Sequence, residues 1–123
     1  LQSCPATFIN THHGITPRYR GAHGAYWALF NKDARNCGVT VHVVDEGIDT
    51  GNIIAQALIS PTGQDSFVTY PYLLTESALP LLRSAISDIR EDRLKTVPAT
   101  GQSEIWYHPG FIQYLLGWLR GVR

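Results

Sequence analysis

The stretch FINTHHGITPRYRG, residues 8–21, is the part of the sequence from which the rest of the chain is best interpreted. It begins with apolar, β-prone residues, continues through Asn10, His12 and His13, and breaks at Gly14. This order is typical of a buried strand that delivers side chains to a site at its carboxyl end. Buried strand positions are usually apolar, so polar side chains there need hydrogen-bond partners or a functional role.

A second stretch, CGVTVHVVDEGIDTGNIIAQ at residues 37–56, supplies a further histidine, His42, and a carboxylate, Asp49. Asn10 and His12 are two residues apart, so their side chains leave the same face of a strand. Asp49 can join them only through tertiary structure. Taken alone, each residue also has an ordinary interpretation, because Asn and Asp are common in turns and histidines are common as hydrogen-bonded polar residues.

Length and composition restrict the class of protein. The 123 residues allow one small domain with one core, and the formal net charge of zero does not favour nucleic acid as a partner. The two cysteines, Cys4 and Cys37, do not make a disulfide framework, which is typical of a reducing, cytoplasmic setting. The sequence contains no apolar run that approaches the ~18 residues of a membrane span.

The apolar pattern predicts alternating strands and helices of an α/β protein. The loop at residues 45–52 is too short for a crossover helix, so the strands on either side of it are expected to pair antiparallel. Residues 1–5 are expected to be a loop and residues 94–108 an irregular polar arm. The expected strands are 6–11, 39–44 and 53–59, and the expected helices are 24–32, 72–89 and 109–119.

Several short motifs follow one another in an order that is similar to one known family. They are Asn10-Thr11-His12, Pro17, Tyr19-Arg20-Gly21, Trp27-Ala28, Gly38-Val39-Thr40-Val41-His42, Asp49-Thr50-Gly51 and Ile53-Ile54. Each is weak alone, but their order and spacing over about fifty residues make a strong match. Together they resemble the catalytic half of the folate-dependent formyltransferases, which include the amino-sugar, glycinamide-ribonucleotide and methionyl-tRNA formyltransferases.

The resemblance implies a fold and a domain organisation. The chain is expected to be the second half of a dinucleotide-fold-like α/β domain, with one parallel strand plus an antiparallel pair and packing helices. Residues 1–93 are interpreted as the C-terminal half of the formyltransferase catalytic domain, and residues 94–123 as an arm and a C-terminal helix. The family's N-terminal half has no counterpart in this sequence, so the chain is interpreted as a fragment. Its partner is expected to be that half or, through the C-terminal helix, a second copy.

The resemblance also implies an activity. The expected reaction transfers a formyl group from 10-formyltetrahydrofolate to a primary amine of a small molecule. A nucleotide-linked amino sugar is favoured as acceptor, with glycinamide ribonucleotide next. Asn10 is expected to bind the formyl oxygen, His12 to stabilise the tetrahedral intermediate or pass a proton, and Asp49 to handle the proton of the amine. The alternatives are a 10-formyltetrahydrofolate hydrolase, or a fragment that is inactive without its N-terminal half.

Other positions take supporting roles by the same resemblance. His42 is expected to orient the Asp49 loop, although a plain core histidine is as consistent with the pattern. The folate pocket is expected to be lined by the loop that contains Asp45, Glu46, Gly47 and Ile48, which could equally be a solvated acidic turn. The loop expected on the substrate side contains Gly14, Arg18 and Arg20, where a solvated or bracing turn is the alternative.

A metal site is not expected. His12 and His13 are adjacent, so they point to opposite faces of an extended chain. The sequence contains no HExxH or CxxC pairing that would supply a zinc site.

Overall fold

The computed structural model describes residues 6–123. Residues 1–5, which the sequence predicts to be a loop, lie outside this range together with Cys4. The described elements alternate between strands and helices, so the predicted α/β class is confirmed. In chain order they are β1 (Ile9–His12), β2 (Arg20–Gly21), α1 (Gly24–Phe30), the short 3-10 helix η1 (Ala34–Asn36), β3 (Gly38–Val43), β4 (Ile53–Leu58), α2 (Tyr70–Arg90), β5 (Ile105–Trp106) and α3 (Phe111–Leu119).

The central sheet has the strand order β1-β3-β4. The β3 and β4 strands pair antiparallel, as the short loop between them predicts. Within the described residues β1 pairs antiparallel with β3. The expected parallel neighbours of β1 stay a prediction. The register places Asn10 opposite His42, so two predicted site residues meet across the ladder.

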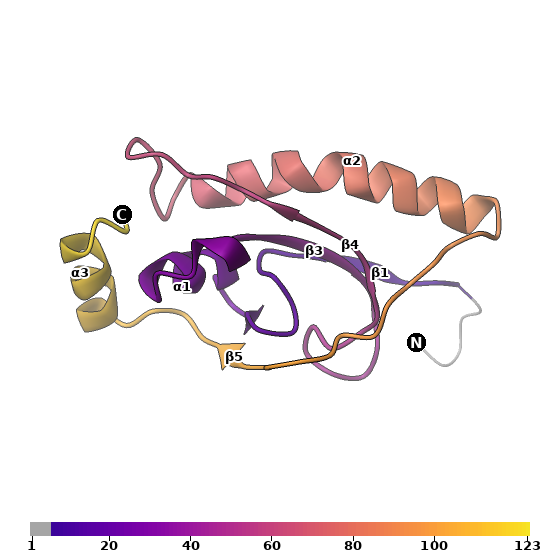
Figure 1. Cartoon of the computed structure of the whole chain (residues 1–123), viewed down its shortest axis with the longest axis horizontal. Coiled ribbons are helices and arrows are strands. Elements are labelled where there is room, and N and C mark those ends of the chain that lie inside the picture. The colour runs from indigo at the N-terminus through magenta and orange to yellow at the C-terminus, as the bar shows by residue number, and fades with distance from the viewer. Residues whose placement is uncertain (1–5) are drawn as a thin grey trace.

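Helix α2 lies along the sheet, and Figure 1 shows it spanning the length of the strands. It begins at Tyr70, two residues before the predicted start, because Pro71 is well suited to the first turn of a helix. Leu74, Ala78 and Ala85 are buried on the side that faces the sheet. Leu79, on another side of the same helix, is 59% exposed.

The main core lies where the first turns of α2 meet α1 and β3. Tyr19, Tyr26, Cys37 and Val39 are fully buried there. Burial raises the pKa of the Cys37 thiol to about 11, so the thiolate that would react with oxidants is scarce at neutral pH. Because Tyr19 lies in the loop after β1 and belongs to this core, the core holds that loop in place.

The arm at residues 94–108 is more ordered than the sequence predicts. Within it, β5 pairs parallel with β2, and the Trp106 ring stacks on Tyr19 with 5.6 Å between centroids. The indole nitrogen of Trp27 also donates a hydrogen bond to the Tyr107 carbonyl over 2.8 Å. A two-residue strand anchored by aromatic contacts leaves no periodic pattern in a polar stretch, so sequence periodicity alone does not detect it.

Helix α3 lies at the end of the molecule opposite the close of α2 (Figure 1). It contacts the core through Gly117, where an added Cβ would come within 2.4 Å of the Tyr26 hydroxyl. Its other side is apolar and exposed, with Phe111 at 81% and Ile112 at 71%. Self-association through this side stays a prediction.

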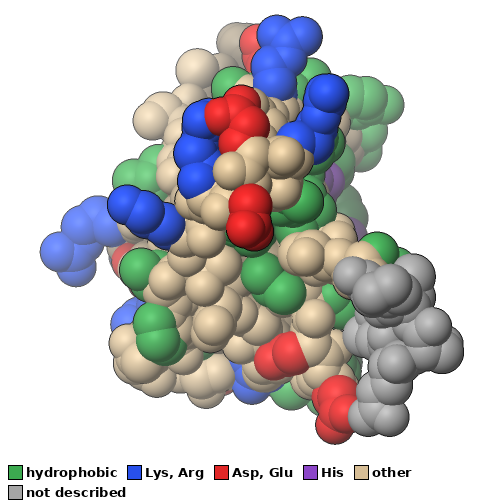
Figure 2. Space-filling model, turned by 90° about the vertical axis from the view of Figure 1, so that its right-hand side faces the viewer, with side chains coloured by type: hydrophobic (Ala, Val, Ile, Leu, Met, Phe, Trp, Pro, Cys, Tyr) green, Lys and Arg blue, Asp and Glu red, His purple; other side chains and the backbone are tan. Residues whose placement is uncertain are grey.

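The far end of α2 is charged. Arg93 forms ion pairs with Asp88, at 2.7 Å, and with Glu91. Figure 2 shows blue and red side chains lying next to one another at the top of this face, so the charge there is mixed rather than uniformly basic. No helix among residues 6–123 combines the length and the apolarity that crossing a membrane requires.

We expect Leu74→Ala to reduce the free energy of unfolding by about 2–5 kcal/mol, because it removes a buried side chain and leaves a cavity. Leu79→Ala makes the same chemical change at an exposed position of the same helix and should shift it by no more than about 0.5 kcal/mol. Urea unfolding of both variants measures the difference. Equal losses would contradict the described packing of α2.

Candidate active site

Four predicted site residues converge at the end of the central sheet. The Nδ2 atom of Asn10 lies 3.2 Å from Nε2 of His42 and 3.3 Å from Oδ1 of Asp49. Nδ1 of His12 lies 3.2 Å from the other carboxylate oxygen, Oδ2 of Asp49. Asn10 and His12 come from β1, His42 comes from β3, and Asp49 follows in the loop between β3 and β4.

Asp49 is the meeting point of these contacts. Its backbone has φ of 52°, in the left-handed region that Asp tolerates better than most residues, and its side chain is 13% exposed. The Gly21 amide donates a hydrogen bond of 2.9 Å to Oδ2. Burial raises the pKa of the carboxyl, but hydrogen bonds from His42 and the Gly21 amide outweigh that effect. The net pKa is therefore lowered, and Asp49 is an anion at neutral pH.

His12 is held from both sides of its ring. Nε2 donates to the Tyr19 carbonyl over 2.6 Å, and Nδ1 faces Asp49. A carbonyl oxygen only accepts, so the neutral ring carries its proton on Nε2 and turns a lone pair toward the carboxylate. Burial lowers the pKa of His12, although the Tyr19 carbonyl and the charge of Asp49 act in the opposite direction.

His42 faces the same carboxylate but differs in charge preference. Its Nδ1 donates to the Val43 carbonyl over 2.9 Å, and its Nε2 lies 3.4 Å from Oδ1 of Asp49. The hydrogen bond with Asp49 raises the pKa of His42 more than burial lowers it. The carboxylate thus lies between a histidine whose pKa is lowered and one whose pKa is raised.

This arrangement can accept a proton and stabilise negative charge. The lone pair on Nδ1 of a neutral His12 and the Oδ2 atom of Asp49 are both acceptors, so one further proton between them is favourable. The Asn10 amide supplies N–H donors beside them. An amide donor next to a proton-accepting pair is suited to the attack of an amine on a carbonyl group.

The acidic loop at residues 45–50 is held by hydrogen bonds between its own residues and by one from Arg20. Oδ1 of Asp45 accepts hydrogen bonds from the Gly47 amide, at 3.1 Å, and from the Thr50 hydroxyl, at 2.7 Å. Arg20 donates to the Ile48 carbonyl over 2.9 Å, while the Ile48 side chain is 58% exposed. The loop is therefore braced in one shape, and its role in folate binding, to which Glu46 also belongs, stays a prediction.

The remaining predicted positions, Gly14 and Arg18, fall on either side of the turn. Gly14 lies against the catalytic face, since an added Cβ there would come within 2.7 Å of Nε2 of His12. Arg18 instead pairs with Asp33 at 2.8 Å and donates to Gln102 over 2.8 Å. These contacts brace the loop, as the alternative interpretation held, and a substrate contact by Arg18 stays a prediction.

Three backbone groups that orient the side chains of the site are not predicted by the sequence. They are the Gly21 amide and the carbonyls of Tyr19 and Val43. Gly21 has φ of 88°, and an added Cβ would come within 2.3 Å of the Trp106 carbonyl, so the residue has to be glycine. The sequence Arg20-Gly21 indicates a turn with this conformation, but it does not indicate that the Gly21 amide binds the Asp49 carboxylate.

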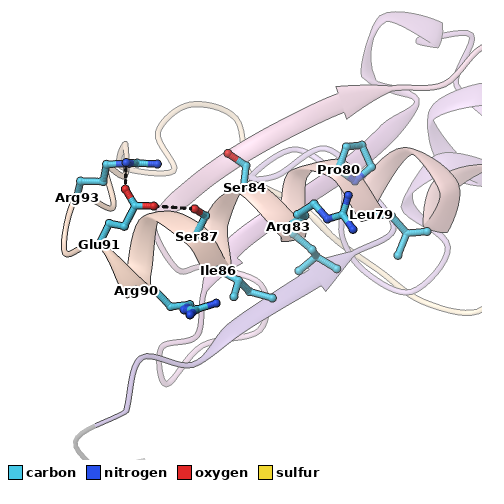
Figure 3. A pocket seen from close by; sticks show the side chains of 10 residues that line it. Leu79, Pro80, Arg83, Ser84, Ile86, Ser87, Arg90, Glu91 and Arg93 are labelled. Atoms are coloured by element: carbon cyan, nitrogen blue, oxygen red, sulfur yellow. Dashed lines mark hydrogen bonds and ion pairs between the residues drawn. The ribbon is translucent and has the colours of Figure 1, made fainter.

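The site does not coincide with the larger hollow of the surface, which has about 1340 Å³ and runs along α2. Figure 3 shows that the labelled side chains lining it, such as Arg83, Ile86 and Arg90, come from this one helix and its end. None of the predicted site residues lines it. Among residues 6–123, no group of three or more His, Cys, Asp or Glu side chains is arranged to hold a metal ion.

A family model described as formyl transferase matches residues 1–78, which is more than half of the chain. The chain belongs to the formyl transferase family. A methionyl-tRNA formyltransferase from Thermodesulfovibrio yellowstonii is 38% identical over 101 residues, which cover 82% of this chain and 32% of that protein. The chain spans about a third of the length of the curated relatives that it matches.

Solved structures of other formyl transferases share the fold. The formyltransferase PseJ from Anoxybacillus kamchatkensis, in complex with UDP-4,6-dideoxy-4-formamido-L-AltNAc and tetrahydrofolate, superposes with a TM-score of 0.70 and 28% identity over 80% of this chain and 51% of PseJ. An N-formyltransferase from Helicobacter canadensis, in complex with folinic acid and dTDP-3-aminofucose, gives 0.71 and 25% over 80% of this chain and 37% of that protein.

We expect Asp49→Asn to lower the pKa of His42, because it removes the partner whose hydrogen bond raises that pKa. In the native chain the pKa of His42 lies above its ordinary value of 6.5. Its protonation therefore adds stability that is fully present below about pH 6.5 and is lost as the pH rises through the folded value. An NMR titration of the His42 ring protons measures the change. Asp65→Asn, a carboxylate outside the site, is the control, and an unchanged His42 titration would rule out the contact.

We expect Gly21→Ala to cost more than about 1 kcal/mol of stability, because alanine is strained at positive φ and its methyl group would meet the Trp106 carbonyl. Gly63→Ala is the matched control, since nothing lies within 4 Å of an added Cβ there. Urea unfolding compares the two variants. Equal free energies of unfolding for the two variants would contradict the close contact between β2 and β5.

Proposed function

We propose that this chain carries the catalytic residues for transfer of a formyl group from 10-formyltetrahydrofolate to the primary amine of a small molecule. The observation that supports the proposal is the meeting of Asn10, His12 and Asp49 within 3.2–3.3 Å contacts in a formyl transferase fold. The folate donor is inferred from solved relatives that hold tetrahydrofolate or folinic acid.

The first step forms a carbon–nitrogen bond. The lone pair of the acceptor amine attacks the formyl carbon, and the electron pair of the C=O double bond moves to the oxygen. An N–H of Asn10 donates to that oxyanion and replaces one of the long contacts that Nδ2 makes in the free site, at 3.2 and 3.3 Å. Because the amide is neutral, it stabilises the negative charge that develops on the formyl oxygen. It does not draw a free anion into the site before the reaction.

The following steps move two protons. The attacking nitrogen loses a proton to Asp49, directly or through a water. That proton is stabilised because Nδ1 of His12 and Oδ2 of Asp49, which lie 3.2 Å apart, can share it. The oxyanion then re-forms C=O, the bond from the formyl carbon to the folate nitrogen breaks, and that nitrogen leaves with the electron pair and takes up a proton that His12 passes on. His42 orients Asp49 through the 3.4 Å contact with Oδ1. The products are a formamide and tetrahydrofolate.

A nucleotide-linked amino sugar is the acceptor that we favour, with glycinamide ribonucleotide next. The formal net charge of the chain is zero, and Arg18 and Arg20 are both engaged within the protein. Binding to tRNA depends on neutralising many phosphates, which this chain is poorly equipped to do. The two solved relatives that hold a nucleotide sugar support the same preference.

We expect Asn10→Ala to reduce kcat by about 100–1,000-fold, the usual cost of losing one oxyanion donor. Tetrahydrofolate release from 10-formyltetrahydrofolate measures turnover with nucleotide-linked amino sugars, glycinamide ribonucleotide, initiator methionyl-tRNA or no amine. Thr11→Ala, on the opposite face of β1, is the control. Turnover at the same rate without any amine would identify a hydrolase, and no turnover with any acceptor, by a chain that binds no 5-formyltetrahydrofolate in calorimetry, would overturn the proposal.

A further inference from the structure

One row of the central sheet carries polar side chains on all three strands. The register places His12 of β1 opposite Thr40 of β3, and Thr40 opposite Gln56 of β4. Directly opposed residues of an antiparallel pair leave the same face of the sheet, so the three side chains lie on the face that also holds Asn10 and His42. Neither Thr40 nor Gln56 takes part in the steps described above.

The hydroxyl of Thr40 is the centre of a buried hydrogen-bond network, since the residue is 0% exposed. Its Oγ1 donates to the Gly14 carbonyl over 2.7 Å. The same oxygen accepts from the Thr16 amide at 3.1 Å and from Nε2 of Gln56 at 3.0 Å. A hydroxyl has one proton and two lone pairs, so all of its hydrogen-bonding capacity is used. Thr40 therefore supports the loop after β1 and is not free to bind a reactant.

Gln56 completes the network from the neighbouring strand. Its Nε2 carries two protons, and it donates to Oγ1 of Thr40 and, over 2.9 Å, to the Thr16 carbonyl. Both polar groups of the Thr16 backbone and the Gly14 carbonyl are thus held by these two side chains. Ile15, which lies between Gly14 and Thr16, is fixed together with them.

The loop that is held in this way leads to the ring of His12. The Ile15 carbonyl accepts from the Tyr19 amide at 2.9 Å, and the Tyr19 carbonyl accepts from Nε2 of His12 at 2.6 Å. Gly14 packs against this second bond, because an added Cβ would come within 2.7 Å of Nε2 of His12 and closer still to the Tyr19 carbonyl. A displacement of the loop at Gly14 or Ile15 would therefore weaken the contact that fixes the proton of the neutral ring on Nε2.

We propose that Gln56, together with Thr40, is a positioning residue for the transfer reaction. The two side chains hold the loop after β1 so that His12 keeps its proton on Nε2 and turns the lone pair of Nδ1 toward Asp49. The inference rests on the proposed function, in which Nδ1 and the carboxylate share the proton that the amine loses. Gln56 touches no reactant, so its loss should slow the transfer step and leave the affinity for the folate little changed.

The donor character of Gln56 separates positioning from simple packing. Glutamate has nearly the same shape as glutamine, but an ionised carboxylate only accepts hydrogen bonds and would face the Thr16 carbonyl, which is also an acceptor. Gln56 is an exposed residue, so Gln56→Glu removes the donor without opening a cavity in the core. Gln64→Glu makes the same change at another exposed position, outside this network, and is the control for the added charge.

The test is NMR of the imidazole rings, at a pH where His12 is neutral, because ¹⁵N shifts distinguish a proton on Nε2 from one on Nδ1. We expect the Nε2–H tautomer alone in the native chain. Gln56→Glu and Thr40→Val should give a mixture of tautomers and faster exchange of the Nε2 proton with water. Thr40→Ser keeps the hydroxyl and should keep the native pattern.

Thr16→Val is the matched control for Thr40→Val. It removes a hydroxyl that is also buried, since Thr16 is 3% exposed, but that has no hydrogen-bond partner within residues 6–123. We expect the His12 signals of this variant to stay native. In turnover of 10-formyltetrahydrofolate, Gln56→Glu should lower kcat by about 10–100-fold, the size of effect that a misplaced catalytic group produces, with little change in KM for the folate.

The outcomes separate this inference from the function on which it rests. Native His12 signals in Gln56→Glu, or disturbed signals in Thr16→Val or Thr40→Ser, would overturn the positioning role. So would a native kcat in a Gln56→Glu chain whose His12 is disturbed. If Thr40→Val does not fold, Gln56→Glu decides the question alone. A native chain that turns over no acceptor loses the proposed function, whereas the NMR comparison still decides whether Gln56 and Thr40 hold His12.

Discussion

The carboxylate of Asp49 is the group on which the site depends. Taking a carboxylate out of water is costly unless donors replace the water, and here they come from three separate segments. The Gly21 amide donates to one oxygen, and His42 and Asn10 approach the other. If any of these partners moves, the charge is left with fewer donors. The donors that fix the geometry of the site therefore also stabilise the structure around it.

The same carboxylate makes two similar histidines unlike each other. Both donate one ring nitrogen to a backbone carbonyl, and both turn the other nitrogen toward Asp49. Burial dominates at His12 and lowers its pKa, whereas the hydrogen bond with Asp49 dominates at His42 and raises its pKa. Because the two imidazoles around one carboxylate have opposite pKa shifts, they are suited to different parts of a proton transfer.

The sequence predicts most of the side chains but few of their supports. The two-residue spacing of Asn10 and His12 on a strand is a local property, and it holds in the structure. The antiparallel pairing of β3 with β4 also follows from a short loop. The pairing of β2 with β5 and the amide that binds Asp49 depend on residues far apart in the chain, which no local pattern encodes. The opposite charge preferences of His12 and His42 likewise depend on burial, which the sequence does not give residue by residue.

The parallel pair of β2 and β5 has a consequence for how the molecule reaches its working shape. Arg20 pairs with Ile105, so the two strands are 85 residues apart. Closing so long a loop costs entropy before any contact repays it, and folding slows as such contacts come to dominate. The strand that presents the Gly21 amide to Asp49 thus gains its neighbour only after nearly all of the chain has collapsed. Species on the folding route that already contain the β1-β3-β4 sheet would still lack a finished catalytic centre.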